Sequence, residues 1–432
     1  MHLSPDQEDA CSVYGVWCGS CWGALAGCSR VPEPVAPQRP VVTFLHYFTD
    51  SLSGGVDDMA RVFNANNPRY ELKAVALDHE SFDASMQDTL QHGHPPDLYS
   101  YWAGERTAAV LADLEPIDDV WKQAKLDERF SASLIRAASV YRGKTYFLPL
   151  TQHVVGFFYS KKVFAAYGVQ PPKTWEEFLA VCERLRSGGV TPIALGAKDR
   201  WPAQFWFDFL LLRTVPYEFR ERLMAGSASY DDPKVHAVFA RWAELIEKGY
   251  FNAAPNDAAW DKDANAMVHD GKAAMTLMGT WNLGHLAQKP YEWVPGKDYG
   301  FFPFPMIVPE IPAVALGPID GIVIPKKAQN LPGAKEALVF LAGVEAQRAF
   351  SQGSGALAPN LDIPRSVYNE VQQHALDEIG RSPYFAFPYD LSTPPALAEL
   401  GLNAFSEFLA YPKAYPTLLR QLARDVHAHT QR

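Results

Sequence analysis

Hydrophobic and polar positions alternate along the chain in a pattern that predicts strands followed by helices. The first run, VVTFLHYF from Val41 to Phe48, is rich in β-forming residues. The amphipathic run SGGVDDMARVFNANNP comes next and ends at Asn-Asn-Pro, as a helix does. YELKAVAL predicts a second strand, SFDASMQDTLQHGHPPD a second helix and LYSYWAG a third strand. Strand–helix–strand units of this kind indicate an α/β fold, in which a mostly parallel sheet is flanked by helices.

The alternation continues through the rest of the chain. Two strand-like runs flank Pro149, and TWEEFLAVCERLRSGG predicts a helix with a capping box of Thr174 and Glu177. DGKAAMTLMGTWNLGHLAQ predicts a buried strand, a turn and a helix. At that turn we expect Gly279 to let the chain change direction and Thr280 to cap the helix. A chain of 432 residues is too long for one ordinary domain, so two lobes are expected.

The charge pattern argues against a nucleic-acid partner. The net charge is −10, and charged residues are spread along the chain without a basic arm or stripe. Aromatic residues make up 13% of the chain, which suits a large core and also sites that stack on flat apolar ligand faces. No second His lies at metal-ligand spacing from His153, and we expect neither a metal nor a cofactor.

The first 40 residues predict an export signal and a tether. Val13 to Ala26 is apolar and rich in small residues, and the LAGC that ends at Cys28 resembles a bacterial lipoprotein signal, in which that cysteine is lipidated. Residues 29–40 are Pro-rich and lack periodicity, as a spacer does. Residues 1–12 contain acidic residues and no Lys or Arg, whereas signals carry positive charge there. A disordered cytosolic leader is therefore the alternative.

Six motifs carry a resemblance to a known family. They are PPDLYSYWAGER, YFLPLTQHVVGFFYSKKVFAAYGV, PKTWEEF, DGKAAMTLMGTW, YGFFPFP and DGIVIPKKA. Each motif is weak alone, but their order and spacing from Val41 to the C-terminus resemble the extracellular sugar-binding proteins of bacterial ABC importers. That group includes the maltose- and oligosaccharide-binding proteins.

The resemblance implies a periplasmic-binding-protein fold of two α/β lobes with the ligand cleft between them. The chain would cross between the lobes near Pro149, near Pro318 and again after Val371. The expected parts are residues 1–28 (signal), 29–40 (tether), 41–148 with 320–371 (first lobe), and 149–319 with 372–432 (second lobe). The protein would be a non-catalytic monomer tethered through Cys28 in the periplasm or at the outer face of the cell membrane. It would close on a mono- or oligosaccharide and deliver it to the transmembrane subunits of an ABC permease.

A sugar site needs aromatic rings for the apolar C–H face of the sugar, and charged or amide groups for its hydroxyls. The resemblance implies such contacts from Trp102, Glu105 and Arg106 after the third strand, and from Gln152 and His153 at the first crossing. Trp281, in MGTWNLGH, lies at a strand–helix turn and matches the stacking aromatic of the family. We therefore expect Trp281 to face Trp102 across the cleft.

Further candidates come from their positions in the sequence. Asp50 follows the first strand, where it either accepts sugar hydroxyls or caps the next helix, and Tyr47 is a weaker neighbour. Asp320 precedes an apolar strand near the second crossing, where it bonds a hydroxyl or holds the hinge loop. Trp201 is favoured for the cleft within DRWPAQFWFDF, which also offers Trp206 and Asp208, and Trp260 is a rim candidate. Core positions are expected for Trp121, Trp175 and Trp242.

Two alternative functions share these features. A glycoside hydrolase also uses tryptophans and carboxylates, but no local motif marks its acid–base pair. The same fold could also bind a non-sugar solute such as a polyamine, a metal chelate or an opine. A polyamine site would need more acidic residues than the candidate cleft offers, and a site for an anionic ligand would need more arginines. The aromatic residues of the candidate cleft favour a sugar.

Overall fold

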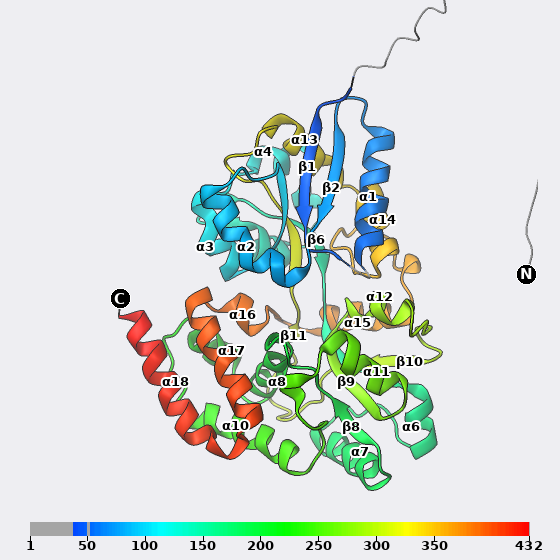
Figure 1. Cartoon of the computed structure of the whole chain (residues 1–432), viewed down its shortest axis with the longest axis vertical. Coiled ribbons are helices and arrows are strands. Elements are labelled where there is room, and N and C mark those ends of the chain that lie inside the picture. The colour runs from blue at the N-terminus through cyan, green and yellow to red at the C-terminus, as the bar shows by residue number, and fades with distance from the viewer. Residues whose placement is uncertain (1–37, 50–51, 432) are drawn as a thin grey trace, which may run out of the picture. The chain divides into compact units, whose positions relative to one another are not determined.

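The computed structural model describes residues 38–49 and 52–431. The predicted signal and tether, Cys28 and Asp50 lie outside the described residues, apart from the last three positions of the tether. Residues from Arg39 onward form one compact unit. This unit contains two main sheets with their helices (Figure 1).

The first sheet has the strand order β2-β1-β3-β12-β6. Its strands are β1 (Val41–His46), β2 (Glu71–Ala76), β3 (Leu98–Trp102), β6 (Leu148–Gln152) and β12 (Ile319–Val323). All of them point in the same direction except β12, which is antiparallel to both β3 and β6. Its helices are α1 (Ser53–Asn66), α2 (His79–His92), α3 (Glu105–Val110), α4 (Asp118–Gln123), α13 (Leu331–Leu341) and α14 (Val344–Ser354). We call this part the first lobe.

The second sheet has the order β10-β7-β9-β8, and β7 runs opposite to the other three strands. Its strands are β7 (Val155–Ser160), β8 (Thr191–Ala194), β9 (Ala273–Gly279) and β10 (Tyr299–Phe302). The larger helices around it, which form the second lobe, are α6 (Lys161–Tyr167), α7 (Trp175–Ser187), α8 (Trp201–Leu212), α9 (Tyr217–Met224), α10 (Pro233–Glu247), α12 (Asn282–Ala287), α15 (Glu370–Arg381), α17 (Pro395–Ala410) and α18 (Tyr415–Thr430). Figure 1 shows α17 in orange-red beside α8, and α18 in red beside α10.

Local signals in the sequence account for several of these elements. The capping box at the start of α7 is confirmed, because Thr174 accepts from the N–H of Glu177 and the Glu177 carboxylate accepts from the N–H of Thr174. Every residue of β9 is buried, as its apolar run predicted. Core positions are likewise confirmed for Trp121, Trp175 and Trp242, and Trp206 is fully buried as well.

Two hydrophobic cores underlie the two lobes. Buried side chains up to Leu150 and from Ile319 to Ala356 form the first core, and those from Val154 to Leu316 and from Leu357 onward form most of the second. Apart from Leu391, which is buried in the first core, the chain passes from the first core to the second between Ala356 and Leu357. The crossing between the lobes after Val371 stays a prediction. Hydrophobic periodicity shows which face of a segment is buried, but not which of two cores receives it.

His46, at the end of β1, makes the first core sensitive to pH. Its side chain lies between the rings of Phe44 and Phe48, it is 3% exposed, and its Nδ1 has no hydrogen-bond partner among the residues that the structure describes. Burial lowers the pKa of His46 to about 4. In the unfolded chain the pKa of the His46 imidazole is about 6.5. Between about pH 4 and pH 6.5 the unfolded state therefore binds more protons than the folded state.

We therefore expect the stabilising contribution of neutral His46 to be complete above about pH 6.5 and to be lost as the pH falls towards 4. The free energy of unfolding should decrease by about 3 kcal/mol across this window. Urea unfolding between pH 7 and pH 4.5 measures the effect, and His46→Phe should flatten the slope. Exposed His92 provides the control, since His92→Gln should leave the slope unchanged. An equally steep slope in His46→Phe would contradict the assignment.

Candidate functional site

Three of the predicted tryptophans lie together in the second lobe, although they come from distant parts of the chain. Trp201 begins α8, Trp260 begins a single π-helical turn, and Trp281 follows β9. The ring of Trp201 is 5.7 Å from that of Trp260 and 5.9 Å from that of Trp281, centroid to centroid. All three indoles are partly exposed, so they form an aromatic surface that a ligand can contact. We call these residues the tryptophan group.

Gly279 and Thr280 position Trp281, but not in the way that the sequence suggested. A Cβ on Gly279 would lie 1.9 Å from the indole of Trp281, and the φ of Gly279 is not in the left-handed region. Glycine is therefore needed here so that the indole can lie against the end of β9. Helix α12 has no side-chain cap, because the hydroxyl of Thr280 is bonded elsewhere and Trp281 occupies the N-cap position. Capping by Thr280 was a wrong prediction.

A chain of buried polar side chains connects the two lobes next to this group. The hydroxyl of Tyr47, after β1, donates to Asp320 Oδ1 at 2.7 Å, and Asp320 Oδ2 lies 3.3 Å from His153 Nε2. His153 Nδ1 is 3.0 Å from the hydroxyl of Thr280, and the His153 ring meets the indole of Trp281 edge to face at 5.3 Å. Burial and the Asp320 carboxylate raise the pKa of Tyr47 well above its usual value. These contacts fix the orientation of Trp281 relative to the first sheet.

Trp102 is enclosed by residues near the end of β3. Tyr47 stacks on it at 4.3 Å with an interplanar angle of 11°, and the guanidinium of Arg106 lies 4.7 Å from the centroid of the indole. Only 6% of Trp102 is exposed, so it has no open face for a ligand in this conformation. Stacking on Trp102, as the sequence suggested, would require the Arg106 side chain to move.

The other predicted polar residues differ in their freedom to bind a ligand. Glu105 is the first residue of α3, it is half-buried, and burial raises its pKa. Within the described residues no hydrogen bond or ion pair engages its carboxylate, and the side chain of Gln152 likewise has no hydrogen-bond partner there. Arg106 forms ion pairs with Asp83 of α2 and Asp390 of the second lobe. Glu105 and Gln152 are thus the candidates with unoccupied hydrogen-bonding groups.

Two further residues differ from the prediction: Asp208 has a structural role, and His285 was not selected from the sequence. Asp208 is fully buried and forms an ion pair with Arg220 at 2.7 Å, so it is a structural residue. His285 was missed, although its ring lies 4.8 Å from that of Trp260. The signal was present in MGTWNLGH, where His285 follows Trp281 by four residues, the spacing that brings side chains together on a helix.

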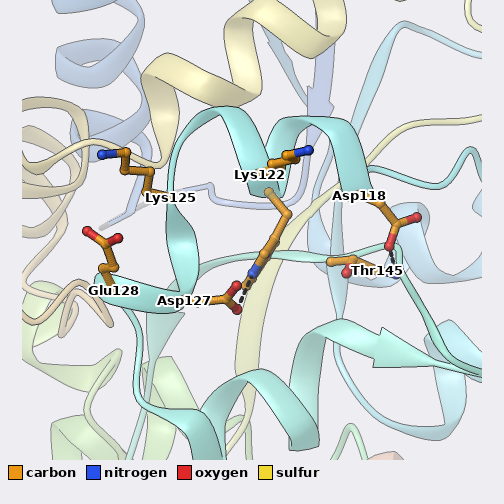
Figure 2. Close-up of a pocket in the computed structure, with 7 residues that line it drawn as sticks. Asp118, Lys122, Lys125, Asp127, Glu128 and Thr145 are labelled. Carbon is orange, nitrogen blue, oxygen red and sulfur yellow. Dashed lines mark hydrogen bonds between the residues drawn. The ribbon is translucent and has the colours of Figure 1, made fainter.

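A separate surface hollow lies in the first lobe (Figure 2). Its lining residues are Asp118, Trp121, Lys122, Lys125, Asp127, Glu128 and Thr145. Trp121 donates to Asp127 at 3.0 Å, and the ammonium groups of Lys122 and Lys125 point away from each other. None of the candidate residues lines this hollow, and its charged groups do not converge on one point. We therefore do not assign the ligand to it.

Two properties of the described residues bear on the class of site. In that part of the chain, no three His, Cys, Asp or Glu side chains are placed to hold a metal ion together. No helix among the same residues has the length and apolar character required to cross a membrane.

Comparison with known families identifies the group to which the fold belongs. The model of the bacterial extracellular solute-binding proteins matches residues 48–348, well over half of the chain. The chain belongs to this family. Members of the family are non-catalytic, so this solute-binding protein is not an enzyme and the glycoside hydrolase alternative is set aside.

Individual relatives cover most of the protein. It is 31% identical over 372 residues to an uncharacterized ABC transporter extracellular-binding protein of Pyrococcus horikoshii, covering 83% of this chain and 81% of the relative. A "probable sugar-binding periplasmic protein" of Mesorhizobium japonicum is 27% identical over 321 residues, 70% of this chain and 71% of the relative. Among solved structures, the bacterial solute receptor AcbH superposes with a TM-score of 0.84 at 26% identity, covering 90% of this chain and 99% of AcbH.

These findings give the protein its general role. It is the solute-binding component of an ABC transporter, it has the two-lobed fold of its relatives, and it belongs to a family that works outside the cytoplasmic membrane. Its natural partner is therefore an ABC permease.

Proposed function

We propose that this solute-binding protein binds a mono- or oligosaccharide between its two lobes and closes on it for delivery to the permease. The observation that carries the proposal is the tryptophan group, in which Trp201, Trp260 and Trp281 form a partly exposed aromatic surface. Aromatic surfaces suit the apolar C–H faces of sugars. The relatives support the same class of ligand, since AcbH is described as having an exclusive preference for β-D-galactopyranose.

In this proposal Trp281 is the stacking platform, and the polar side chains after β3, in β6 and in β12 bind hydroxyls. The side chains of Glu105 and Gln152 have no hydrogen-bond partner in the described part of the chain, and a carboxylate that accepts a hydroxyl contributes about 1.5–3 kcal/mol. The Asp320 carboxylate can accept roughly four hydrogen bonds, and two of these positions are taken by Tyr47 and His153. The other positions can accept from a ligand. The proposed ligand-binding residues are Asp50, Trp102, Glu105, Arg106, Gln152, His153, Trp201, Trp260, Trp281 and Asp320.

The cellular arrangement in this proposal is a monomer anchored through lipidated Cys28. Residues 29–40 would be the spacer between the membrane and the first lobe, and their proline content suits an extended segment. We propose that the two lobes that move on closure are divided where the chain passes from one hydrophobic core to the other. The hinge crossings would then lie near Pro149, near Pro318 and at Ala356–Leu357.

A ligand panel tests the proposed function. The full chain is titrated calorimetrically with D-galactose, maltose, xylo-oligosaccharides, chito-oligosaccharides and spermidine, and thermal melts are recorded with each compound at high concentration. A bound sugar at 100 times its Kd should stabilise the protein by about 2.7 kcal/mol. Tryptophan fluorescence should change without release of reducing ends. Binding of spermidine together with no response to any sugar would contradict the proposal.

Native mass spectrometry of protein purified from its host complements the panel. Ligands that remain bound should appear as an added mass equal to a whole number of sugar units. A retained mass that corresponds to a non-sugar solute would also contradict the proposal.

A further inference from the structure

Helix α16 (Tyr389–Ser392) lies between the two lobes. The side chain of Tyr389 is buried in the second core, whereas that of Leu391 is buried in the first. The backbone of α16 comes so close to the start of α3 that a Cβ on Gly104 would lie 2.3 Å from the carbonyl oxygen of Leu391. Gly104 also has a φ of +91°, which favours glycine. This part of the second lobe is therefore fitted against the helix that carries Glu105 and Arg106.

The position of α16 is set by buried groups of the second lobe. The N–H of Tyr389 donates to Asp208 Oδ2 at 2.8 Å, and Asp208 is itself paired with Arg220. Arg220 Nη2 donates to the carbonyl of Phe387 at 2.6 Å, just before the helix. The N–H of Asp390 donates to the side chain of Gln204 on α8 at 2.9 Å. The carboxylate of Asp390 is thus presented to the first lobe from a rigid support.

The carboxylate of Asp390 forms an ion pair with Arg106 of the first lobe. The Nη2 of Arg106 is 3.4 Å from Asp390 Oδ2, and its Nη1 contacts Asp83. The two partners differ in environment, since the side chain of Asp83 is 41% exposed and that of Asp390 is 13% exposed. Water and salt weaken exposed ion pairs, whereas a partly buried pair keeps more of its attraction. The attraction of Asp390 for the guanidinium is therefore screened less than that of Asp83, although the Asp83 contact is the closer one.

We propose that Asp390 is a positioning residue, which holds the Arg106 guanidinium over Trp102 from the opposite lobe when the lobes are together. Opening of the lobes would separate the pair and release Arg106, so that the arginine is preorganised only in the closed arrangement. The effect on ligand affinity rests on the proposed function, because that function assigns Arg106 to the sugar. The position of the guanidinium itself does not depend on the identity of the ligand.

The test compares Asp390→Asn with Asp83→Asn, which removes the other carboxylate from the same guanidinium. Asn at position 390 keeps the side-chain size and the backbone bond to Gln204, so the variant should fold with an unchanged melting temperature. Crystal structures in which the two lobes are together then give the distance from the guanidinium carbon to the centroid of Trp102. We expect about 4.7 Å in the wild type and in Asp83→Asn, and displacement by several Å in Asp390→Asn. A guanidinium that stays over Trp102 in Asp390→Asn would overturn the proposal.

Affinity and conformation give an independent readout. For each panel sugar that the wild type binds, Kd should rise about fivefold or more in Asp390→Asn and less than twofold in Asp83→Asn. Asp390→Glu, which keeps the charge, should recover part of the loss, as a purely structural residue would not. Small-angle X-ray scattering at the same sugar concentration should show a larger radius of gyration for Asp390→Asn than for the wild type.

The two proposals can fail separately. If no panel sugar binds the wild type, the proposed function fails, while crystal structures with the two lobes together still decide whether Asp390 positions Arg106. If Asp390→Asn aggregates, Asp390→Ser provides the same measurement with a smaller side chain. Equal Kd values and equal radii of gyration in the wild type and a folded Asp390 variant would reject the positioning role.

Discussion

Trp281→Ala should weaken sugar binding by at least tenfold while the protein remains folded. The indole is partly exposed and belongs to the tryptophan group, so its removal takes away contact area for the ligand but little of the core. Tenfold corresponds to about 1.4 kcal/mol, which equals the burial of roughly 55 Å² of apolar surface at 25 cal/mol per Å². Calorimetric titration with the tightest-binding sugar of the panel measures the loss, and a thermal melt measures the stability.

Two variants make this result specific. Trp293 is another partly buried tryptophan of the second lobe, which packs on His269 and Tyr299 and has no ring contact with the tryptophan group. Trp293→Ala should leave the affinity within about twofold of the wild type, because it removes an indole away from the proposed platform. Trp281→Phe should retain part of the affinity, since a smaller ring still stacks. Unchanged affinity in a folded Trp281→Ala protein would refute the platform role.

The sequence predicted most of the elements of the fold because their signals are local. The alternating run before His46, the capping box at Thr174 and the wholly apolar run of β9 each specify an element within a few residues. Which core a segment joins is decided by contacts far along the chain. That is why the sequence could not locate the change of core at Ala356–Leu357.

The candidate site was predicted unevenly for the same reason. Trp201, Trp260 and Trp281 were each selected from their place at a loop or turn, and the fold brings them together. The enclosure of Trp102 depends on Tyr47 and on the rotamer of Arg106, and neither is marked by a motif. Asp390 was not selected because its partner lies 284 residues away in the sequence. Such long-range pairing leaves no local pattern.

Asp208→Ala should destabilise the protein by about 3–5 kcal/mol, the usual cost of leaving a buried charge without its partner. Both side chains of the Asp208–Arg220 pair are fully buried, and Asp208 also accepts the N–H of Tyr389. Urea unfolding at pH 7 measures the change. Glu221 is the matched control, because its carboxylate lies 3.4 Å from Arg220 but is 51% exposed. Glu221→Ala should therefore cost less than about 1 kcal/mol.

A double variant separates the energy of the ion pair from the cost of isolating its charge. In Asp208→Leu with Arg220→Met no buried charge is left unpaired, so part of the stability lost in Asp208→Ala should return. The recovery should be incomplete, because Met cannot donate to the carbonyl of Phe387 as Arg220 does. That missing bond should loosen α16, and with it Asp390. The double variant is therefore expected to bind sugar more weakly than its recovered stability alone would suggest. Wild-type affinity in this variant would show that α16 is held in place without the Asp208–Arg220 pair.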